Sequence, residues 1–186
     1  MTPAALVDLV QLLDRLALLP RTGWLLRGVT DPESIAEHTL GVAVVAAALV
    51  DDVRARGVEV DGERVLRMAL VHDAAEVFTG DIPMPAKTEA LDAALAEAED
   101  AQLAKVLPPE LLALWRDAER GTSIEARIVK AADKLQMVVK ALSYTQQKRG
   151  DVRELLENAR NRRHMDLDFA KELFAEVDRR RTALAT

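Results

Sequence analysis

The sequence contains no cysteine, and this absence removes two kinds of structure from consideration. No disulfide framework can form, and no thiolate is available to bind a metal. Any metal site in this chain must therefore use histidine, aspartate, glutamate or water. The absence is compatible with a reducing compartment, and we expect a cytoplasmic protein.

Positive charge and aromatic side chains are also scarce. Lysine and arginine number 25 against 31 acidic residues, which gives a formal net charge of -6, and aromatic residues make up 3% of the chain. Proteins that coat nucleic acid need clustered cations and stacking aromatics. A nucleic-acid-binding module is thus the weakest of the functions considered, and we expect no nucleic-acid partner. A small phosphate ligand stays compatible if positive charge is concentrated locally.

Long apolar runs are missing as well. No segment approaches the roughly 18 to 20 apolar residues that span a bilayer. The N-terminal stretch carries Asp8 and Asp14 within its apolar pattern and lacks a basic leader before an apolar block. It is therefore typical of a mature amphipathic helix, and we expect no membrane partner.

The composition favours one helical domain. The chain has 186 residues, of which 49% are hydrophobic and 30% charged, with alanine and leucine dominating over β-branched and aromatic residues. One domain usually takes about 100 to 200 residues. We predict a single all-α domain over residues 1–186, a helical bundle with its core at about 5–145 and its C-terminal helices at about 151–182.

Apolar periodicity and capping signals predict where the helices lie. The expected helical segments are residues 3–18, Ser34 through the apolar run 40–50, 61 to about 78, 88–107, a short helix through Trp115, 122–144, 151–163 and 167–182. Ser34 with Glu37, and Thr122 with Glu125, have the spacing of a capping box. Residues 19–33 and 79–87 are expected to be irregular, because proline and glycine interrupt the helical pattern.

The first helix is expected to pack against the body through one apolar stripe at helical spacing. The residues of that stripe are Leu6, Leu9, Val10, Leu13, Leu16 and Ala17. The run 40–50 is apolar nearly all round, so its helix should be central.

Two of the three histidines, His38 and His72, lie in segments that are otherwise strongly apolar. A lone buried histidine is commonly satisfied by a backbone carbonyl, and that interpretation stays open for each. His72 is followed directly by Asp73, and Glu76 lies four residues after His72. On a helix His72 and Glu76 share a face, while Asp73 lies about 100° round. Burying two carboxylates beside a histidine costs roughly several kcal/mol, which a bound cation offsets.

Asp133 is a further carboxylate, at the margin of the core stripe of the predicted helix 122–144. A salt bridge with Lys130 or Lys134 is the alternative to a metal-binding role. Together with the two histidines and Asp73 it forms a nitrogen and oxygen ligand set. Such a set suits one divalent ion, which could be manganese, cobalt, iron, nickel, zinc or, less well, magnesium.

A divalent ion with an open coordination position lowers the pKa of a bound water and polarises a phosphoryl oxygen. Glu76 and Asp81 are acids close to the ligand set in sequence, and either could take a proton from that water. The residues therefore predict hydrolytic chemistry.

The order His38, then His72 with Asp73, then Asp133 resembles the HD-domain metal-dependent phosphohydrolases. Five blocks resemble more narrowly the 5'-deoxynucleotidase branch of that superfamily, over about residues 5–145. They are RTGW at 21–24, SIAEH at 34–38, HDAAE at 72–76, GDIPMPAK at 80–87 and KAADKL at 130–135. Five blocks in this order are far more specific than an HD dipeptide alone.

The resemblance implies a single HD domain in which four residues bind the metal. These ligands are His38, His72, Asp73 and Asp133. It implies that Glu76 is the catalytic acid or base and that Asp81 lies near the sugar of the substrate, with a catalytic or binding role. It also implies a homodimer or higher homo-oligomer.

Substrate contacts are implied for Arg21 and Trp24, at the phosphate and the deoxyribose. Here Thr22 and Gly23 separate the two, whereas some bacterial members have the Arg and Trp adjacent. A solvated charge and a loop anchor are the structural alternatives for these positions. Other candidates for the positive charge that a phosphate needs are Arg27, Lys87, Lys130 and Lys134.

The leading hypothesis is a 5'-deoxynucleotidase that releases phosphate from deoxynucleoside 5'-monophosphates. One alternative is a phosphohydrolase of deoxynucleoside triphosphates such as dATP. An alternative of another class is a non-catalytic nucleotide-binding sensor with a structural metal. The presence of Glu76 and Asp81 weighs against the sensor, because a structural site needs no spare base.

Overall fold

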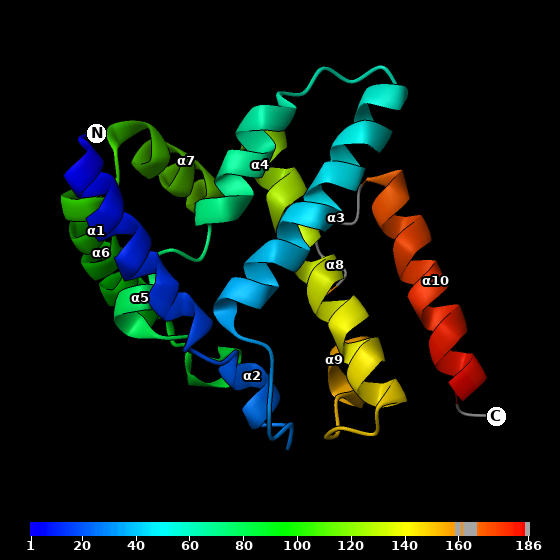
Figure 1. Ribbon diagram of the computed structural model, residues 1–186. Helices are drawn as coiled ribbons and strands as arrows, with labels where there is room; N and C mark the ends of the chain where they lie inside the picture. Colours follow the sequence, from blue (N-terminus) through cyan, green and yellow to red (C-terminus); the bar gives the residue numbers. More distant parts are fainter. Residues whose placement is uncertain (159–160, 162–166, 185–186) are drawn as a thin grey trace.

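The computed structural model describes residues 1–158, 161 and 167–184, and within these ranges the regular elements are helical (Figure 1). In chain order they are α1 (Pro3–Asp14), the 3-10 helix η1 (Arg15–Ala17), α2 (Thr22–Leu25), α3 (Ile35–Ala55), α4 (Gly62–Val71), α5 (Glu76–Thr79), the 3-10 helix η2 (Met84–Ala86), α6 (Glu89–Val106), α7 (Pro109–Arg120), α8 (Ile124–Gln146), α9 (Arg153–Glu157) and α10 (Asp168–Leu184). The prediction of an all-α fold is confirmed.

Helices α3 and α8 form the centre of the molecule and pack along each other, with α4 against both. Helices α9 and α10 cover α8 on one side, while α7 packs on α4 and α8 from the other (Figure 1). Helix α6 packs on α7 and α5, and α1 crosses in front of α5 and α6 in the view of Figure 1. The metal-ligand candidates come from the central layer, so the core of the fold positions them.

The burial of α3 and α8 follows from apolar residues at helical spacing. In α8 the buried residues are Ala126, Ile128, Val129, Ala131, Ala132, Leu135, Gln136, Val138, Ala141, Leu142 and Tyr144. Helix α3 is central as expected, but one of its faces points outward. Leu40 and Val44 on that face are 67% and 64% exposed, because the neighbours of α3 cover only its other sides.

The expectation that the whole stripe of the first helix packs against the body is wrong for Leu6, Val10 and Ala17. Leu6 and Val10 are 50% and 59% exposed, and Ala17 is exposed as well. Leu9 and Leu16 are buried, so a narrower line of residues reaches the body. The helix also ends at Asp14 and continues as the tighter η1.

Of the two predicted capping boxes, the first is confirmed, and at the second the N-cap is shifted by one residue. Ser34 and Glu37 form a reciprocal capping box on α3, and Asp61 caps α4. At α8 the N-cap is Ser123 rather than Thr122, since the Ser123 hydroxyl accepts the amide of Ala126 at 3.1 Å.

The third predicted helix is not continuous, and the expected span from 61 to about 78 is wrong in its middle. Helix α4 ends at Val71, and the backbone then tightens so that the amides of Ala74 and Glu76 each bond the carbonyl three residues back. Nδ1 of His72 lies 2.7 Å from the carbonyl oxygen of Ala69. In an unbroken α-helix the carbonyl of Ala69 accepts the amide four residues later. The contact of the His72 imidazole with this carbonyl therefore coincides with the place where the backbone leaves the α-helical winding.

Other boundaries shift by short distances. The loops at 19–33 and 79–87 contain the single turns α2 and η2, and the helix through Trp115 continues to Arg120. Of the helix expected at 151–163, the structure shows Arg153–Glu157, and residues 159–160 and 162–163 lie outside the described residues. Among the described residues, no helix combines the length and the apolar character that a membrane span requires.

Candidate metal centre and active site

Side chains from four separate segments converge at the buried end of α3. His38 is the fourth residue of α3, and Asp133 lies near the middle of α8. His72 and Asp73 occupy the tight turn after α4, and Glu76 begins α5. The fold thus brings together residues that are far apart in the sequence.

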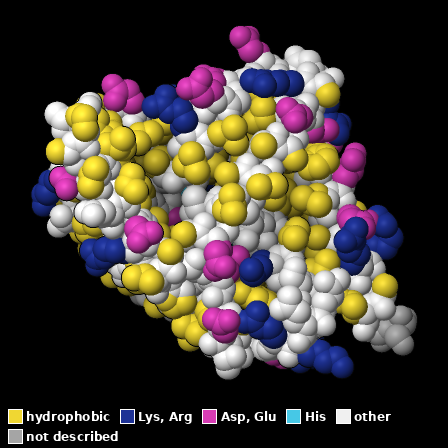
Figure 2. All heavy atoms as spheres, in the orientation of Figure 1, with side chains coloured by type: hydrophobic (Ala, Val, Ile, Leu, Met, Phe, Trp, Pro, Cys, Tyr) yellow, Lys and Arg dark blue, Asp and Glu magenta, His cyan; other side chains and the backbone are white. Residues whose placement is uncertain are grey.

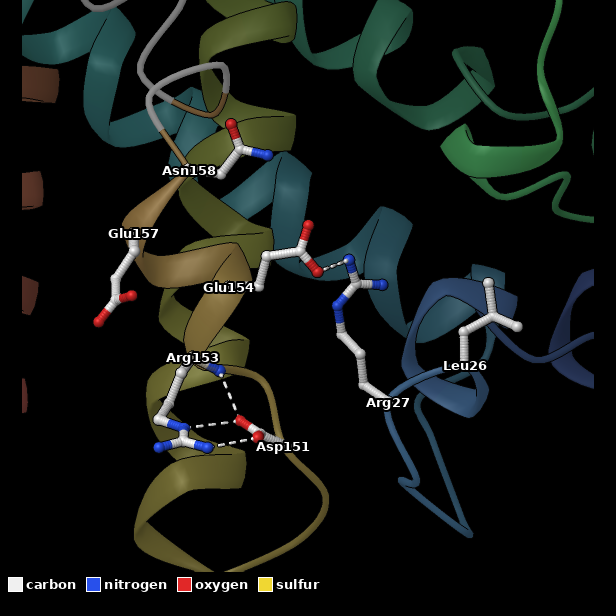
Figure 3. Close-up of a pocket in the computed structure, with 7 residues that line it drawn as sticks. All are labelled: Leu26, Arg27, Asp151, Arg153, Glu154, Glu157 and Asn158. Carbon is white, nitrogen blue, oxygen red and sulfur yellow. Dashed lines mark hydrogen bonds and ion pairs between the residues drawn. The ribbon is translucent and has the colours of Figure 1, made fainter.

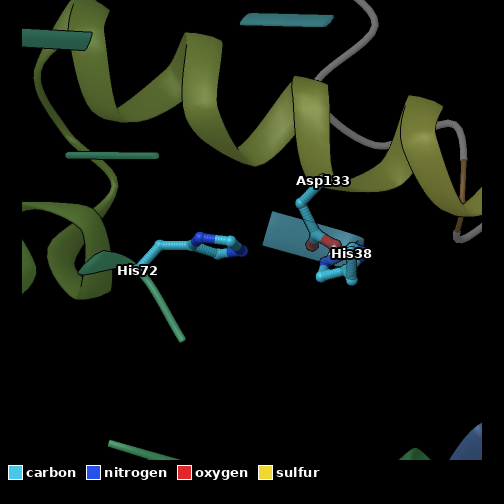
Figure 4. Close-up of side chains that lie close together, drawn as sticks. All are labelled: His38, His72 and Asp133. Atoms are coloured by element: carbon cyan, nitrogen blue, oxygen red, sulfur yellow. Dashed lines mark ion pairs between the residues drawn. The ribbon is translucent and has the colours of Figure 1, made fainter. Parts of the chain in front are cut away.

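Three donor atoms, one each from His38, His72 and Asp133, lie within 4.8 Å of one another, a spacing at which one metal ion could be held (Figure 4). Nε2 of His38 is 3.3 Å from Oδ1 of Asp133. Asp73 adjoins this group, since its Oδ2 lies 3.2 Å from Nε2 of His72 and 3.6 Å from Nε2 of His38.

In both histidines the second ring nitrogen, Nδ1, has a hydrogen-bond partner outside the cluster. Nδ1 of His72 contacts the carbonyl oxygen of Ala69 at 2.7 Å, and Nδ1 of His38 contacts the amide oxygen of Gln136 at 2.6 Å. Each partner is an acceptor, so each Nδ1 carries the proton and a neutral ring leaves the Nε2 lone pair free. The backbone-carbonyl interpretation of His72 is therefore correct for one nitrogen of the ring and leaves the other to be explained.

The two Nε2 atoms are buried and have no hydrogen-bond partner of acceptable geometry. A buried polar atom without a partner is costly. Two such atoms that face the carboxylates of Asp73 and Asp133 are a donor set that fits a divalent cation. The observed residues therefore fit a metal ion chemically.

Asp133 also forms the salt bridge that was the alternative to a metal-binding role. Its Oδ2 lies 3.0 Å from Nζ of Lys134, while Oδ1 faces the histidines. Burial alone would raise the pKa of Asp133, but Lys134 and His38 outweigh it and hold this pKa well below its ordinary value. Lys130 turns elsewhere and donates to the carbonyl of Glu119. The two roles of Asp133 are therefore compatible.

The charges of His72 and Asp73 support each other. Burial alone would lower the pKa of His72, but the Asp73 carboxylate overrides it and raises this pKa to about 9. Burial would raise the pKa of Asp73, yet His72 and Arg21 hold it below its ordinary value. Before a cation arrives, the pair thus carries a proton that a metal ion would displace.

The pKa of Glu76 is shifted in the opposite direction from that of Asp73. Burial and the neighbouring Asp73 raise the pKa of Glu76 to about 9. Its Oε2 is buried without a hydrogen-bond partner, and Oε1 is 3.7 Å from the Arg21 guanidinium. A carboxyl group that holds its proton near neutral pH beside a metal-binding cluster is suited to acid and base chemistry.

Arg21 is the cation of the site. Its Nη1 lies 3.3 Å from Oδ2 of Asp73 and 3.2 Å from Oδ1 of Asp81. Burial opposes the charge on Arg21, but these carboxylates raise its pKa above the ordinary value. Arg21, which was predicted as a phosphate contact, therefore also compensates the negative charge of Asp73 and Asp81.

Asp81 fastens the loop at 79–87 to the loop at 19–33. Its Oδ2 accepts the amide of Thr22 at 2.5 Å and the hydroxyl of the same residue at 2.8 Å, and its Oδ1 faces Arg21. Both carboxylate oxygens are thus engaged within the protein. In this conformation Asp81 positions the start of α2 and the guanidinium of Arg21.

Trp24 and Lys87 are placed differently from the other predicted substrate residues. Trp24 is 3% exposed, its Nε1 donates to Oε1 of Glu33 at 3.0 Å, and its ring meets Tyr144 edge to face. Lys87 is exposed just after η2, where its charge acts on Glu99 and Glu119. Neither residue belongs to the cluster around the histidines.

Arg27, also a candidate for phosphate contact, lines a cavity that is separate from the metal-ligand cluster. This cavity of about 730 Å³ is bordered by Leu26, Arg27, Asp151, Arg153, Glu154, Glu157 and Asn158 (Figure 3). Arg27 pairs there with Glu154 at 3.1 Å, and Arg153 pairs with Asp151 at 2.6 Å. The cavity shares no residue with the metal-ligand cluster, and its own acids neutralise its arginines.

Two buried polar residues next to the site were not predicted from the sequence. Gln136 contacts His38, and Glu33 in turn accepts from Nε2 of Gln136 at 2.9 Å. A signal existed for Gln136, which lies one helical turn after Asp133 and therefore faces the same way. Nothing in the pattern of the loop at 19–33 marks Glu33 as buried.

Comparison with known proteins agrees with this geometry. Residues 13–173 match the family described as HD domain. The human protein 5'-deoxynucleotidase HDDC2 is 36% identical over 146 residues, which are 75% of this chain and 68% of the human protein.

Solved structures show the same fold. The structure of the PH0347 protein from Pyrococcus horikoshii OT3 has a TM-score of 0.82 at 36% identity, and the match covers 94% of this chain and 99% of that one. The cyanophage S-2L HD phosphohydrolase DatZ, bound to dA and one catalytic Zn²⁺ ion, has a TM-score of 0.62 at 28% identity, over 91% of this chain and 94% of the phage protein. The resemblance noted in the sequence is thereby confirmed, and the chain belongs to the HD domain family.

Proposed function

We propose that this protein is a metal-dependent phosphohydrolase that releases phosphate from deoxynucleoside 5'-monophosphates. The observation that carries the proposal is the convergence of the buried Nε2 atoms of His38 and His72, neither of which has a hydrogen bond of acceptable geometry, on the carboxylates of Asp73 and Asp133. The human relative is a 5'-deoxynucleotidase, and the phage neighbour is bound to dA and one catalytic Zn²⁺ ion, which supports a deoxynucleotide substrate.

The metal ligands in this proposal are His38, His72, Asp73 and Asp133. When bound, a divalent ion supplies positive charge that activates water and polarises a phosphoryl oxygen. The ligand set suits cobalt, manganese, zinc, iron, nickel or magnesium. Elemental analysis of the purified protein, together with anomalous scattering at the edges of the candidate metals, would identify the ion.

Glu76 supplies the proton transfers. As the oxygen of water bonds to phosphorus and the bond to the 5'-oxygen breaks, Glu76 gives its proton to the departing 5'-oxygen and takes one from the attacking water. The products are phosphate and a deoxynucleoside. The raised pKa of Glu76 supports this role, because the group holds a transferable proton near neutral pH.

Arg21 supplies positive charge for the phosphate group, since its guanidinium already faces the acids of the site. Asp81 holds Arg21 and the start of α2, and through them it positions the sugar. For Trp24 and Lys87 a substrate role stays a prediction. Trp24 would act from within the core, and Lys87 from the exposed loop that follows η2.

The experiment that tests the function is a product-resolved assay. Protein stripped of metal and reloaded with each candidate ion is incubated with dAMP, dADP and dATP, and with AMP as the ribose control. We expect phosphate and deoxynucleoside from dAMP alone. Turnover of triphosphates without turnover of monophosphates would establish the triphosphohydrolase instead, and nucleotide binding without turnover under any ion would establish a sensor.

We also propose a homodimer. Several exposed hydrophobic side chains lie on α1, α3 and α4, and many of the side chains on the side of the molecule seen in Figure 2 are hydrophobic. The exposed side chains on these three helices include Leu6, Val7, Val10, Leu40, Val44, Leu66 and Leu70. Large exposed apolar patches mark sites of interaction with other proteins, among other uses. Light scattering coupled to gel filtration would give the mass, and a monomer at micromolar concentration would refute the dimer.

Two further expectations belong to the same proposal. We propose that residues 1–186 form a single HD domain, because the family match extends from 13 to 173 and α10 packs on α8 and α3 of the central layer. A deoxynucleotide substrate supports a cytoplasmic site of action. Limited proteolysis and cell fractionation would test the two points.

A further inference from the structure

Behind the metal-ligand cluster runs a chain of three buried hydrogen bonds. The amide oxygen of Gln136 lies 2.6 Å from Nδ1 of His38. Nε2 of Gln136 donates to Oε2 of Glu33 at 2.9 Å, and Nε1 of Trp24 donates to Oε1 of Glu33 at 3.0 Å. His38, Gln136, Glu33 and Trp24 are all buried, so water does not compete for these bonds.

The direction of every bond in this chain is determined. The indole nitrogen of Trp24 can only donate, and Nζ of Lys140, 3.5 Å from Oε2 of Glu33, can only donate as well. Glu33 therefore accepts at both oxygens, which forces Gln136 to turn its NH₂ group toward Glu33 and its oxygen toward His38. Nδ1 of His38 must then carry the proton, and Nε2 is left free.

We propose that Gln136 is a positioning residue for the metal, with Glu33 fixing the orientation of its amide. Together they hold His38 in the tautomer whose Nε2 faces Asp133. The inference rests on the proposed metal site. The inference adds that these three hydrogen bonds select the metal-binding tautomer of His38 before the ion binds.

The backbone leaves space for this amide and for little else. A Cβ built on Gly41, three residues after His38 on α3, would lie 2.7 Å from Cγ and 3.0 Å from Nε2 of Gln136. Gly41 therefore lets Gln136 pass close to the backbone of α3. Gly41→Ala favours the helix intrinsically, but it must push Gln136 aside.

The decisive measurement is the tautomer of His38 in the metal-free protein, read from the imidazole ¹⁵N shifts and two-bond ¹H–¹⁵N couplings. The chain has three histidines, so assignment is tractable. In the parent protein we expect the proton on Nδ1 of the neutral ring. A proton found on Nε2 would overturn the proposal without any variant.

Two variants test the mechanism. Gln136→Met keeps the length of the side chain and removes the amide, so we expect mixed tautomers and a loss of affinity for Zn²⁺ or Co²⁺ of about 10- to 100-fold, the usual effect of losing such a support. Glu33→Gln should reverse the direction of these hydrogen bonds, because the new NH₂ group of residue 33 must donate to Gln136. His38 then has to accept at Nδ1, and its proton moves to Nε2.

The matched control is Gln146→Met, the same change at an exposed position near the end of α8. Affinities are measured by competition with a chromophoric chelator, and helicity by circular dichroism. Gly41→Ala should weaken metal binding, because the new methyl group displaces Gln136. Metal affinities within twofold of the parent in both Gln136→Met and Glu33→Gln, with the proton still on Nδ1, would refute the positioning role. Since none of these readouts requires turnover, failure of the proposed hydrolysis would be seen separately in the nucleotide assay.

Discussion

Oδ1 of Asp133 lies 3.3 Å from Nε2 of His38, so the contact between α8 and α3 carries a carboxylate and an imidazole that both point into the same buried space. On its other side the carboxylate bonds Lys134 at 3.0 Å. Asp133 is therefore held from outside while it presents one oxygen inward.

Asp133→Asn should abolish tight metal binding. The amide keeps the shape of the side chain but removes the negative charge, and the loss should exceed the roughly 10- to 100-fold effect of changing an outer partner. Equilibrium dialysis against Zn²⁺ or Co²⁺ would measure it. Asp92→Asn on the exposed side of α6 is the matched control. Unchanged affinity in the Asp133 variant would exclude this residue as a ligand.

Glu76→Gln should lower kcat on dAMP by about 100- to 10,000-fold, the usual contribution of a general acid or base. Metal affinity should stay close to that of the parent, because the assigned ligands are untouched. Steady-state kinetics and dialysis would be carried out on the same preparation. Turnover at the parental rate would remove Glu76 from the mechanism.

Arg21→Gln should separate substrate binding from metal binding. Loss of charge-assisted hydrogen bonds to phosphate costs about 1.5 to 3 kcal/mol, which is roughly a 10- to 150-fold fall in kcat/KM. Metal affinity should not fall, since removing a cation beside Asp73 and Asp81 leaves more negative charge for the ion. Arg15→Gln, at an exposed position in η1, serves as the control. A variant that loses metal as well as activity would contradict this assignment.

Asp117→Asn should change the response of stability to acid. Burial alone would raise the pKa of Asp117, but hydrogen bonds from Arg64 at 2.6 Å and from Ser123 at 2.8 Å hold this pKa below its ordinary value of 3.8. The depressed pKa means that the carboxylate stabilises the fold above pH 3.8, and that this contribution is lost as the pH falls through the lower, folded-state value.

Urea unfolding at several pH values would measure the effect. The variant should be less stable by about 1 to 3 kcal/mol at neutral pH, as expected for lost hydrogen bonds to a charged group. The difference from the parent should shrink as the solution becomes more acidic than pH 3.8. A difference that is constant with pH would show that the charge of Asp117 is not what stabilises the fold.

The parts of the fold that sequence predicted are those set by local patterns. Apolar residues at helical spacing predicted the helices α3 and α8, and the capping box of Ser34 and Glu37 predicted the start of α3. His38 and His72 stood out because they interrupt such patterns. These signals survive in a single sequence because each depends on neighbours within one or two turns of helix.

The rest depended on contacts between distant segments. Trp24 looks like a loop residue in the sequence, and only its bond to Glu33 and its packing on Tyr144 place it in the core. The break after Val71 accompanies a side-chain contact of His72 with Ala69, which no propensity scale registers. The exposure of Leu6 could not be foreseen either, because it depends on how little of the body lies beside α1.

The ligand candidates come from α3, from the turn after α4 and from α8, and no short stretch of the chain contains them all. The unfolded polypeptide therefore has no comparable binding site, and an ion would dissociate when the helices separate. Release of a coloured ion such as Co²⁺ should then serve as an optical reporter of global unfolding, at the same midpoint as the loss of helicity.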